Sequence, residues 1–482
     1  MSRPDWFAMR AHTLSRLSWV SLAVVLAGCI HYQAKPISPP DSLATFEART
    51  LDDPGLRQFL RANNSVLPSA AAPWDLQPLT LVAFYFNPDL DVARADLAAA
   101  EAGTVTAGAR ENPAVALSAG YNTTTPLDLL SPWILGFNLD IPLTTAGKRG
   151  HRITQATSMA EAARFNLAAV AWQVRSRVRT SLVELHAATM ADELLSEKET
   201  IQGESATLLD RQLEAGAVSS VEVTQAHLAL AAARIARRDA TARTIAARAR
   251  LAGALGIPAA ALEGVPLSFD GITGVARELP TQEARRQAVL NRADLLGALA
   301  EYAASQAALQ LEIAKQYPDI HLGPGYELDQ SQDKWYLALS LPIPIMNSNR
   351  GPIGEAEARR TASAARFVAV QAHAVGQVDQ AVAAYDSARD AAITAERMAG
   401  DLEKQERTAR ARFAAGEISR LELDGARLER VSASLGRLDA TVKAQAALGQ
   451  LEDAMQSPLG LPDGAWQHAP RPPQTSKEEE HP

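Results

Sequence analysis

The sequence predicts a mainly α-helical protein with a membrane β-barrel portion, in which each protomer contributes four β-strands and two very long coiled-coil helices. Three observations predict this fold class. The 482-residue chain repeats itself in tandem. Each repeat carries a stretch in which apolar residues alternate with small or polar ones, and each such stretch leads into a much longer segment with helical spacing of its apolar residues.

The duplication is visible because matching residues recur in one order at a nearly constant offset. Gly120 returns as Gly325, and Gly216 returns as Gly416. Chance matches would not keep one order along the chain. The predicted organisation is a signal peptide over residues 1–28, an N-terminal extended segment over 29–74, a first repeat over 75–258, a linker over 259–280, a second repeat over 281–457 and a disordered tail over 458–482.

The N-terminus has the pattern of a bacterial lipoprotein signal. Arg10 and Arg16 precede a short apolar run, which ends Leu26-Ala27-Gly28-Cys29, and Cys29 is the only cysteine. The run is too short to span a bilayer, so we expect cleavage before Cys29 and a covalent lipid on its thiol, with no other cofactor. The alternative is an ordinary signal peptide followed by a chance cysteine.

Each repeat contains a predicted hairpin, over about residues 113–143 and 318–345. The apolar side chains recur at every second position, through Leu341 and Ile343 at the end of the second hairpin. A half-buried soluble hairpin would show the same alternation. Tyr121, Trp133 and Trp335, however, lie near the strand ends, as in the aromatic girdle of an outer-membrane barrel.

Four strands cannot close a barrel, and an open edge in lipid leaves backbone N–H and C=O groups unpaired at several kcal/mol each. Several copies are therefore expected to share one barrel. Three copies would supply about twelve strands and leave a water-filled lumen.

A long helical stretch follows each hairpin. Residues 150–215 contain no proline, and their apolar residues lie three or four apart, as they also do around Val378 and Val382 in the second repeat. At ~1.5 Å per residue such a helix is a rod of about 100 Å, which is typical of a coiled coil.

Each rod is predicted to end in a tight helix–turn–helix, at residues 216–219 and 416–419. Gly216 and Gly416 are each followed by Ser-x-x-Glu, which is a glycine stop and then a capping box. Both glutamates could act only as caps. The alternative hypothesis is that acidic residues of several copies form a cation-attracting ring in a pore, with the candidate residues Glu222, Glu422 and Asp424.

In these features, the chain resembles the TolC-type outer-membrane efflux channel proteins over roughly residues 75–460. The resemblance implies a homotrimeric exit duct of a tripartite pump, whose twelve-stranded barrel continues into an α-helical barrel in the periplasm. It implies a periplasmic adaptor docked at the tips, near Gly216, Ser219, Gly416 and Ser419, and an inner-membrane pump beyond it. Glu422 matches one family gate acid, whereas Gly425 and Ile418 replace other gate residues.

Other functions find little support in the sequence. The net charge of −8 argues against nucleic acid as a partner, and the common motifs of hydrolases, metalloproteases and nucleotide-binding enzymes are absent, so we expect no catalytic residues. No histidine pair has metal-ligand spacing, although His321 is expected on the lumen face, and Lys148 and Arg149 are expected at the barrel rim. A type I secretion duct, a lipid-anchored adaptor and a coiled coil without a pore remain alternatives. The Leu341-Pro342-Ile343-Pro344 run resembles the heavy-metal and general efflux branches.

Overall fold

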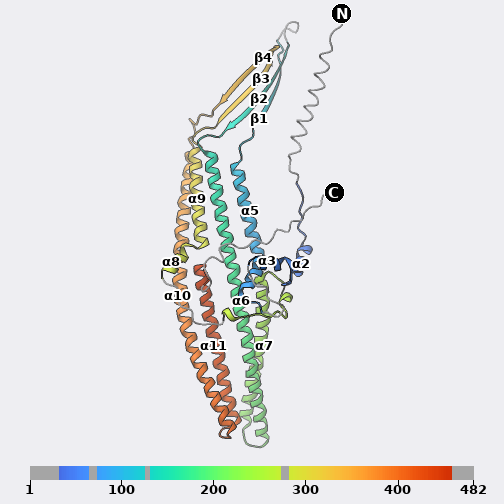
Figure 1. Ribbon diagram of the computed structural model, residues 1–482, viewed down its shortest axis with the longest axis vertical. Helices are drawn as coiled ribbons and strands as arrows, with labels where there is room; N and C mark the ends of the chain where they lie inside the picture. Colours follow the sequence, from blue (N-terminus) through green and yellow to red (C-terminus); the bar gives the residue numbers. More distant parts are fainter. Residues whose placement is uncertain (1–31, 64–72, 125–130, 273–281, 459–482) are drawn as a thin grey trace. The chain divides into compact units, whose positions relative to one another are not determined.

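The computed structural model describes residues 32–63, 73–124, 131–272 and 282–458 (Figure 1). The predicted signal peptide, Cys29 and almost all of the predicted tail lie outside these residues. Residues up to Ala48 belong to a compact unit of their own, which contains helix α2 (Pro39–Glu47). The second unit contains α3 (Pro54–Ala62), α4 (Leu76–Phe86), α5 (Pro88–Gly108), β1 (Ala114–Tyr121), β2 (Trp133–Leu143), α6 (Lys148–Glu214), α7 (Ser220–Leu255), the 3-10 turns η1 (Ala259–Leu262) and η2 (Asp270–Ile272), α8 (Gln282–Leu290), α9 (Ala293–Ala314), β3 (Ile320–Asp329), β4 (Gln332–Ser340), α10 (Arg350–Ala414) and α11 (Arg420–Met455).

The two long helices have 67 residues in α6 and 65 in α10. Each packs along the helix that follows it, α6 with α7 and α10 with α11, so that each repeat forms a long helical hairpin. The helices α5 and α9 run beside α6, and α9 also packs on α10. This arrangement confirms the predicted fold class of duplicated long helices preceded by strands.

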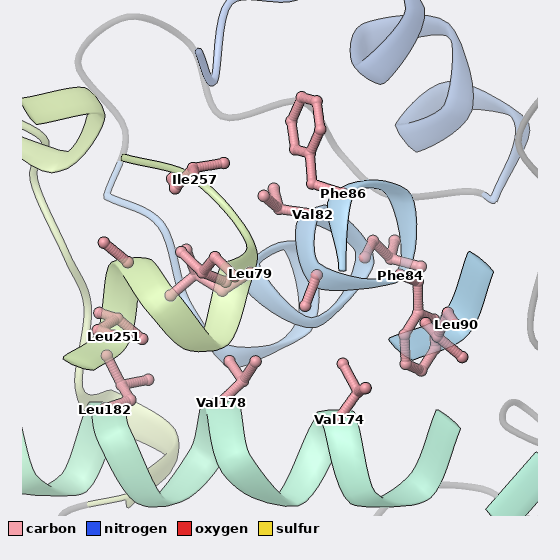
Figure 2. Close-up of a cluster of buried hydrophobic side chains, with 14 of the residues drawn as sticks. Leu79, Val82, Phe84, Phe86, Leu90, Val174, Val178, Leu182, Leu251 and Ile257 are labelled. Carbon is pink, nitrogen blue, oxygen red and sulfur yellow. The ribbon is translucent and has the colours of Figure 1, made fainter. Parts of the chain in front are cut away.

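The core of the first repeat lies where α4 is enclosed by longer helices (Figure 2). Leu79 of α4, Val178 and Leu182 of α6 and Leu251 of α7 are almost fully buried there. Eight of the eleven residues of α4 are buried, which explains why this helix is apolar on nearly all sides. The second repeat has a smaller core of α8, α10 and α11 around Tyr385, in which four of the ten buried residues are alanines that allow close helix approach.

Buried polar side chains join the two repeats along α6 and α11. Arg175 and Arg179 of α6 both contact the Glu452 carboxylate, at 3.3 and 3.4 Å. The Trp172 indole N–H donates to Asp453 at 2.9 Å. Because buried charges are costly unless they are paired, this cluster fixes how α6 and α11 lie against each other.

All four strands form one antiparallel sheet in the order β1-β2-β3-β4. The middle pair comes from different repeats, with Ile141 opposite Leu322 and Leu143 opposite Ile320. The hairpin of the second repeat is shorter than its sequence pattern, because β4 ends at Ser340 and the alternating residues Leu341 and Ile343 lie beyond it. Ser340 lies opposite His321 near the start of β3, so the partner strand ends there, and Pro342 and Pro344 offer no N–H for a further strand partner.

Candidate functional site

The two faces of the sheet differ in the way a membrane barrel requires. The large side chains of one face are exposed, and they include Leu117, Phe137, Trp335, Leu337 and Leu339. Aromatic rings pair across each hairpin on this face, with centroids 5.1 Å apart for Tyr121–Trp133 and 4.9 Å for Tyr326–Trp335. Small and polar residues occupy most of the other face, where Ile134 and Tyr336 are the large exceptions.

The polar face carries the histidine that the sequence analysis places in the lumen. His321 of β3 lies with its Nδ1 atom 3.1 Å from the carboxylate of Asp140 on β2. Both side chains are partly exposed. In the described part of the chain, no group of three or more His, Cys, Asp or Glu side chains is placed to hold a metal ion.

The junction between strands and long helices is held by charged side chains. The Lys148 ammonium lies 2.9 Å from Asp319 and donates to the carbonyl of Tyr317 at 2.6 Å. Burial alone would raise the pKa of Asp319, but the hydrogen bonds from Lys148 and Thr145 outweigh it and hold this pKa below its usual value. Arg149 donates to the carbonyl of Gly108 at the end of α5. Lys148 is therefore buried and paired at the junction of strands and helices, and its expected place at the barrel rim stays a prediction.

Both helical tips turn at the predicted glycines. Gly216 has φ +73° and Gly416 has φ +74°. The N–H of Ala217 donates to the Gln212 carbonyl and that of Glu417 to the Arg412 carbonyl, so each long helix ends in the same hydrogen-bonded cap. Apart from the two adjoining residues, no described heavy atom lies within 4 Å of where a Cβ would be at either glycine, so these turns are open to a partner.

The caps that follow the two glycines are not equivalent. At the second tip the Ser419 N–H donates to Glu422 at 2.7 Å and the Glu422 N–H donates to the Ser419 hydroxyl, which completes the capping box. At the first tip the Ser219 hydroxyl donates to the Glu222 carboxylate and accepts from the Glu222 N–H. The bond from the Ser219 N–H to the Glu222 carboxylate, which would complete the box, is not formed. The prediction of two full boxes is thus wrong for the first tip. Backbone and hydroxyl hydrogen bonds from Ser419 lower the pKa of Glu422.

Asp424 has a different environment from that of an exposed ring carboxylate. Its side chain is 2% exposed, and it lies 3.1 Å from both Arg420 and Arg427. Glu204 of α6 completes an ionic cluster, because it pairs with the same two arginines. The hydrogen bond from Arg427 is the largest cause that lowers the pKa of Glu204. The charge of Arg427 and the hydrogen bond and charge of Arg420 lower it further. In the protomer, Asp424 therefore ties α11 to α6 instead of presenting a free charge.

An open groove lies between the two helical hairpins near their tips. It has a volume of about 570 Å³ and is lined by Gly203, Glu204, Thr207, Leu208, Arg211, Phe413 and Arg420. The sequence patterns do not single out these residues, because each pattern lies within one repeat and the groove is lined by both. The one available signal was the run of acidic residues on α6 beside the run of arginines on α11.

The comparison with known families decides the identity of the fold. The sequence pattern of the outer membrane efflux protein family matches residues 85–257 and again residues 284–456. The chain belongs to the outer membrane efflux protein family. Its two matches correspond to the two repeats, and membership confirms the TolC-type resemblance and the outer-membrane location.

Individual members of the efflux family are distant relatives. The cobalt-zinc-cadmium resistance protein CzcC of Cupriavidus metallidurans is 25% identical over 284 residues, which are 58% of this chain and 66% of CzcC. The chain thus spans just under two thirds of that relative. The crystal structure of CusC has a TM-score of 0.65 at 20% identity and covers 80% of this chain and 92% of CusC.

A second solved structure gives the same fold. The open state of the Neisseria gonorrhoeae MtrE outer membrane channel has a TM-score of 0.65 at 18% identity, over 79% of this chain and 89% of MtrE. At these identities the structures establish the fold. Among the described residues, no helix is both long enough and apolar enough to cross a membrane.

Proposed function

We propose that the chain is the outer-membrane exit duct of a tripartite efflux system, a passive channel formed by three copies. One observation carries this proposal. The exposed apolar face belongs to a sheet whose outer strands, β1 and β4, each have a free edge within the described part of the chain. Lipid does not tolerate a free edge, and three copies would join β4 of each to β1 of the next in about twelve strands.

The tips would receive a periplasmic adaptor. The groove between the hairpins has apolar walls from Leu208 and Phe413 and charged rims from Arg211 and Glu204, and the glycine turns beside it are open. A helical hairpin of an adaptor fits a groove between two helical hairpins, and an inner-membrane pump would supply the transported substrate. The lipid on Cys29 would attach the N-terminus to the same membrane.

Two measurements test the duct. The purified protein should run as a heat-sensitive trimer in unboiled gels and should conduct ions in planar bilayers. A monomer without conductance would contradict the proposal. A Cys29→Ser variant should lose the mass of the lipid while the trimer persists, and an unchanged mass would contradict lipidation.

We propose divalent metal ions as the cargo, because one relative, CzcC, is by name a cobalt-zinc-cadmium resistance protein. A deletion strain should therefore become sensitive to these metals. Copper, dyes and antibiotics serve as the comparison panel. If the strain were sensitive to dyes and antibiotics alone, the proposed metal cargo would be wrong and the duct would serve general drug efflux.

A further inference from the structure

We infer that the segment Leu341–Met346 is a membrane anchor, which inserts among the acyl chains of the periplasmic leaflet next to the barrel. The segment begins where β4 ends and reads Leu-Pro-Ile-Pro-Ile-Met. Its large side chains are unusually exposed for apolar residues, at 70% for Ile343, 80% for Ile345 and 94% for Met346. The first charged residue after β4 is Arg350, at the start of α10.

The segment continues the lipid-facing surface of the sheet. Leu337 and Leu339 of β4 are on the apolar face, and Leu341 keeps the same alternation. Leu341 also lines an apolar groove of about 540 Å³ with Tyr317, Ile320 and three neighbours. The segment therefore contacts the same medium as the adjoining apolar face of the sheet, and that medium is lipid.

The backbone of the segment suits an unpaired stretch in lipid. In hydrocarbon each unsatisfied backbone donor is costly. Pro342 and Pro344 have no N–H, and the N–H of Ile345 donates to the carbonyl of Ile343 at 2.8 Å. The two prolines thus reduce the number of donors that would need a partner.

The first repeat lacks the same device at the matching place. At the offset of 202 that relates Trp133 to Trp335, the segment Ile141–Thr144 matches Ile343–Met346, but Ile141, Pro142 and Leu143 belong to β2 and pair with β3. Thr145 turns inward, since its N–H donates to Asp319 and its hydroxyl to the Pro318 carbonyl. Only the second repeat therefore presents an apolar extension, which would give one anchor per protomer.

Spin-label accessibility in lipid nanodiscs tests the anchor. Single variants Ile345→Cys and Met346→Cys of the full chain are labelled with a nitroxide, and the parent, whose only cysteine is Cys29, is the labelling blank. We expect collision with oxygen, which concentrates in lipid, to exceed collision with a water-soluble nickel chelate several-fold at both positions. Leu337→Cys on β4 is the lipid control, Ala217→Cys at the tip is the water control, and Thr144→Cys is the matched position of the first repeat.

Each outcome is decisive. Nickel accessibility at Ile345 equal to that at Ala217 would overturn the anchor and leave the segment in water. Low accessibility to both reagents with an immobilised spectrum would mean that a second copy of the chain covers it, which also overturns the proposal. The inference rests on the proposed membrane orientation of the sheet, and Leu337 separates the two, because failure there contradicts the duct itself.

Discussion

The substitution Gly449→Ala tests the buried polar interface between α6 and α11. A Cβ at Gly449 would lie 2.4 Å from the Arg179 Nη1 atom, so the guanidinium must move. That group now donates to the Gln445 carbonyl at 2.9 Å and to its side-chain oxygen at 3.0 Å, and its Nε lies 3.4 Å from Glu452. The new methyl group therefore competes with a network of buried, charge-assisted hydrogen bonds.

Two opposing terms set the sign of the effect. Alanine in place of glycine inside a helix stabilises it by about 1 kcal/mol. A hydrogen bond to a charged group is worth about 1.5–3 kcal/mol, and the Arg179 side chain is buried, so solvent screens little of it. Loss of the Nη1 bond alone outweighs the propensity gain, and we expect net destabilisation of about 0.5–2 kcal/mol.

The same helix offers a matched control. No described side chain lies within 4 Å of a Cβ at Gly436, so Gly436→Ala should give only the propensity gain, up to about 1 kcal/mol. The assay is loss of the far-ultraviolet helix signal on heating, at one scan rate for all variants, because large membrane proteins often unfold irreversibly. Gly449→Ala should lower the midpoint and Gly436→Ala should raise it.

The reasoning is refuted if Gly449→Ala raises the midpoint as Gly436→Ala does. A double variant gives a stricter test. When Arg179 is first replaced by Met, nothing charged occupies the space above Gly449, so adding Gly449→Ala should no longer destabilise the protein.

Three further predictions concern the tips. Valine at Gly216 or Gly416 strains a left-handed backbone by about 1–2 kcal/mol without a side-chain clash. Trimers should therefore persist while cross-linking to an adaptor falls, and cross-linking equal to that of the parent would contradict docking at the tips. Glu422→Ala should speed amide exchange in the first turn of α11 more than Glu222→Ala does in α7, because only Glu422 completes a capping box; equal effects would contradict this. The pKa of Glu204 is lowered in the folded protein, so its stabilisation is present above its unfolded pKa of about 4.5 and is lost as the pH falls through the folded value. The difference in melting midpoint between parent and Glu204→Gln should shrink below about pH 4, and a constant difference would contradict the pairing.

The sequence predicted those parts of the fold that depend on local patterns. The long helices, the alternating strands and the glycine turns each follow from residues close together in the chain, and the duplication follows from comparing its two halves. The structure has all of them. Gly216 and Gly416 are the clearest case, because a glycine stop followed by a serine cap specifies a turn with no reference to distant residues.

The parts that the sequence did not predict depend on contacts between repeats. Asp424 looks like an exposed acid in a helix pattern, but its neighbours include Ser205, more than two hundred residues away, whose hydroxyl lies 3.3 Å from it. Lys148 looks like a rim charge, but Asp319 from the other repeat neutralises it. A helical period shows which residues share a face, but it does not show which face of another helix they will meet.

The same limit bears on the pore hypothesis. A carboxylate held by two arginines attracts few further cations, since its charge is already compensated. Asp424 is in this state within one protomer, whereas Glu422 is exposed and its lowered pKa keeps it ionised. If three copies place their tips around one axis, Glu422 and Glu222 are the two of the three candidate residues that keep an exposed carboxylate for an acidic ring. Glu422→Ala should then weaken cation preference in bilayer recordings while Asp424→Asn leaves it unchanged, and the reverse result would mean that assembly breaks the Arg420–Asp424–Arg427 cluster.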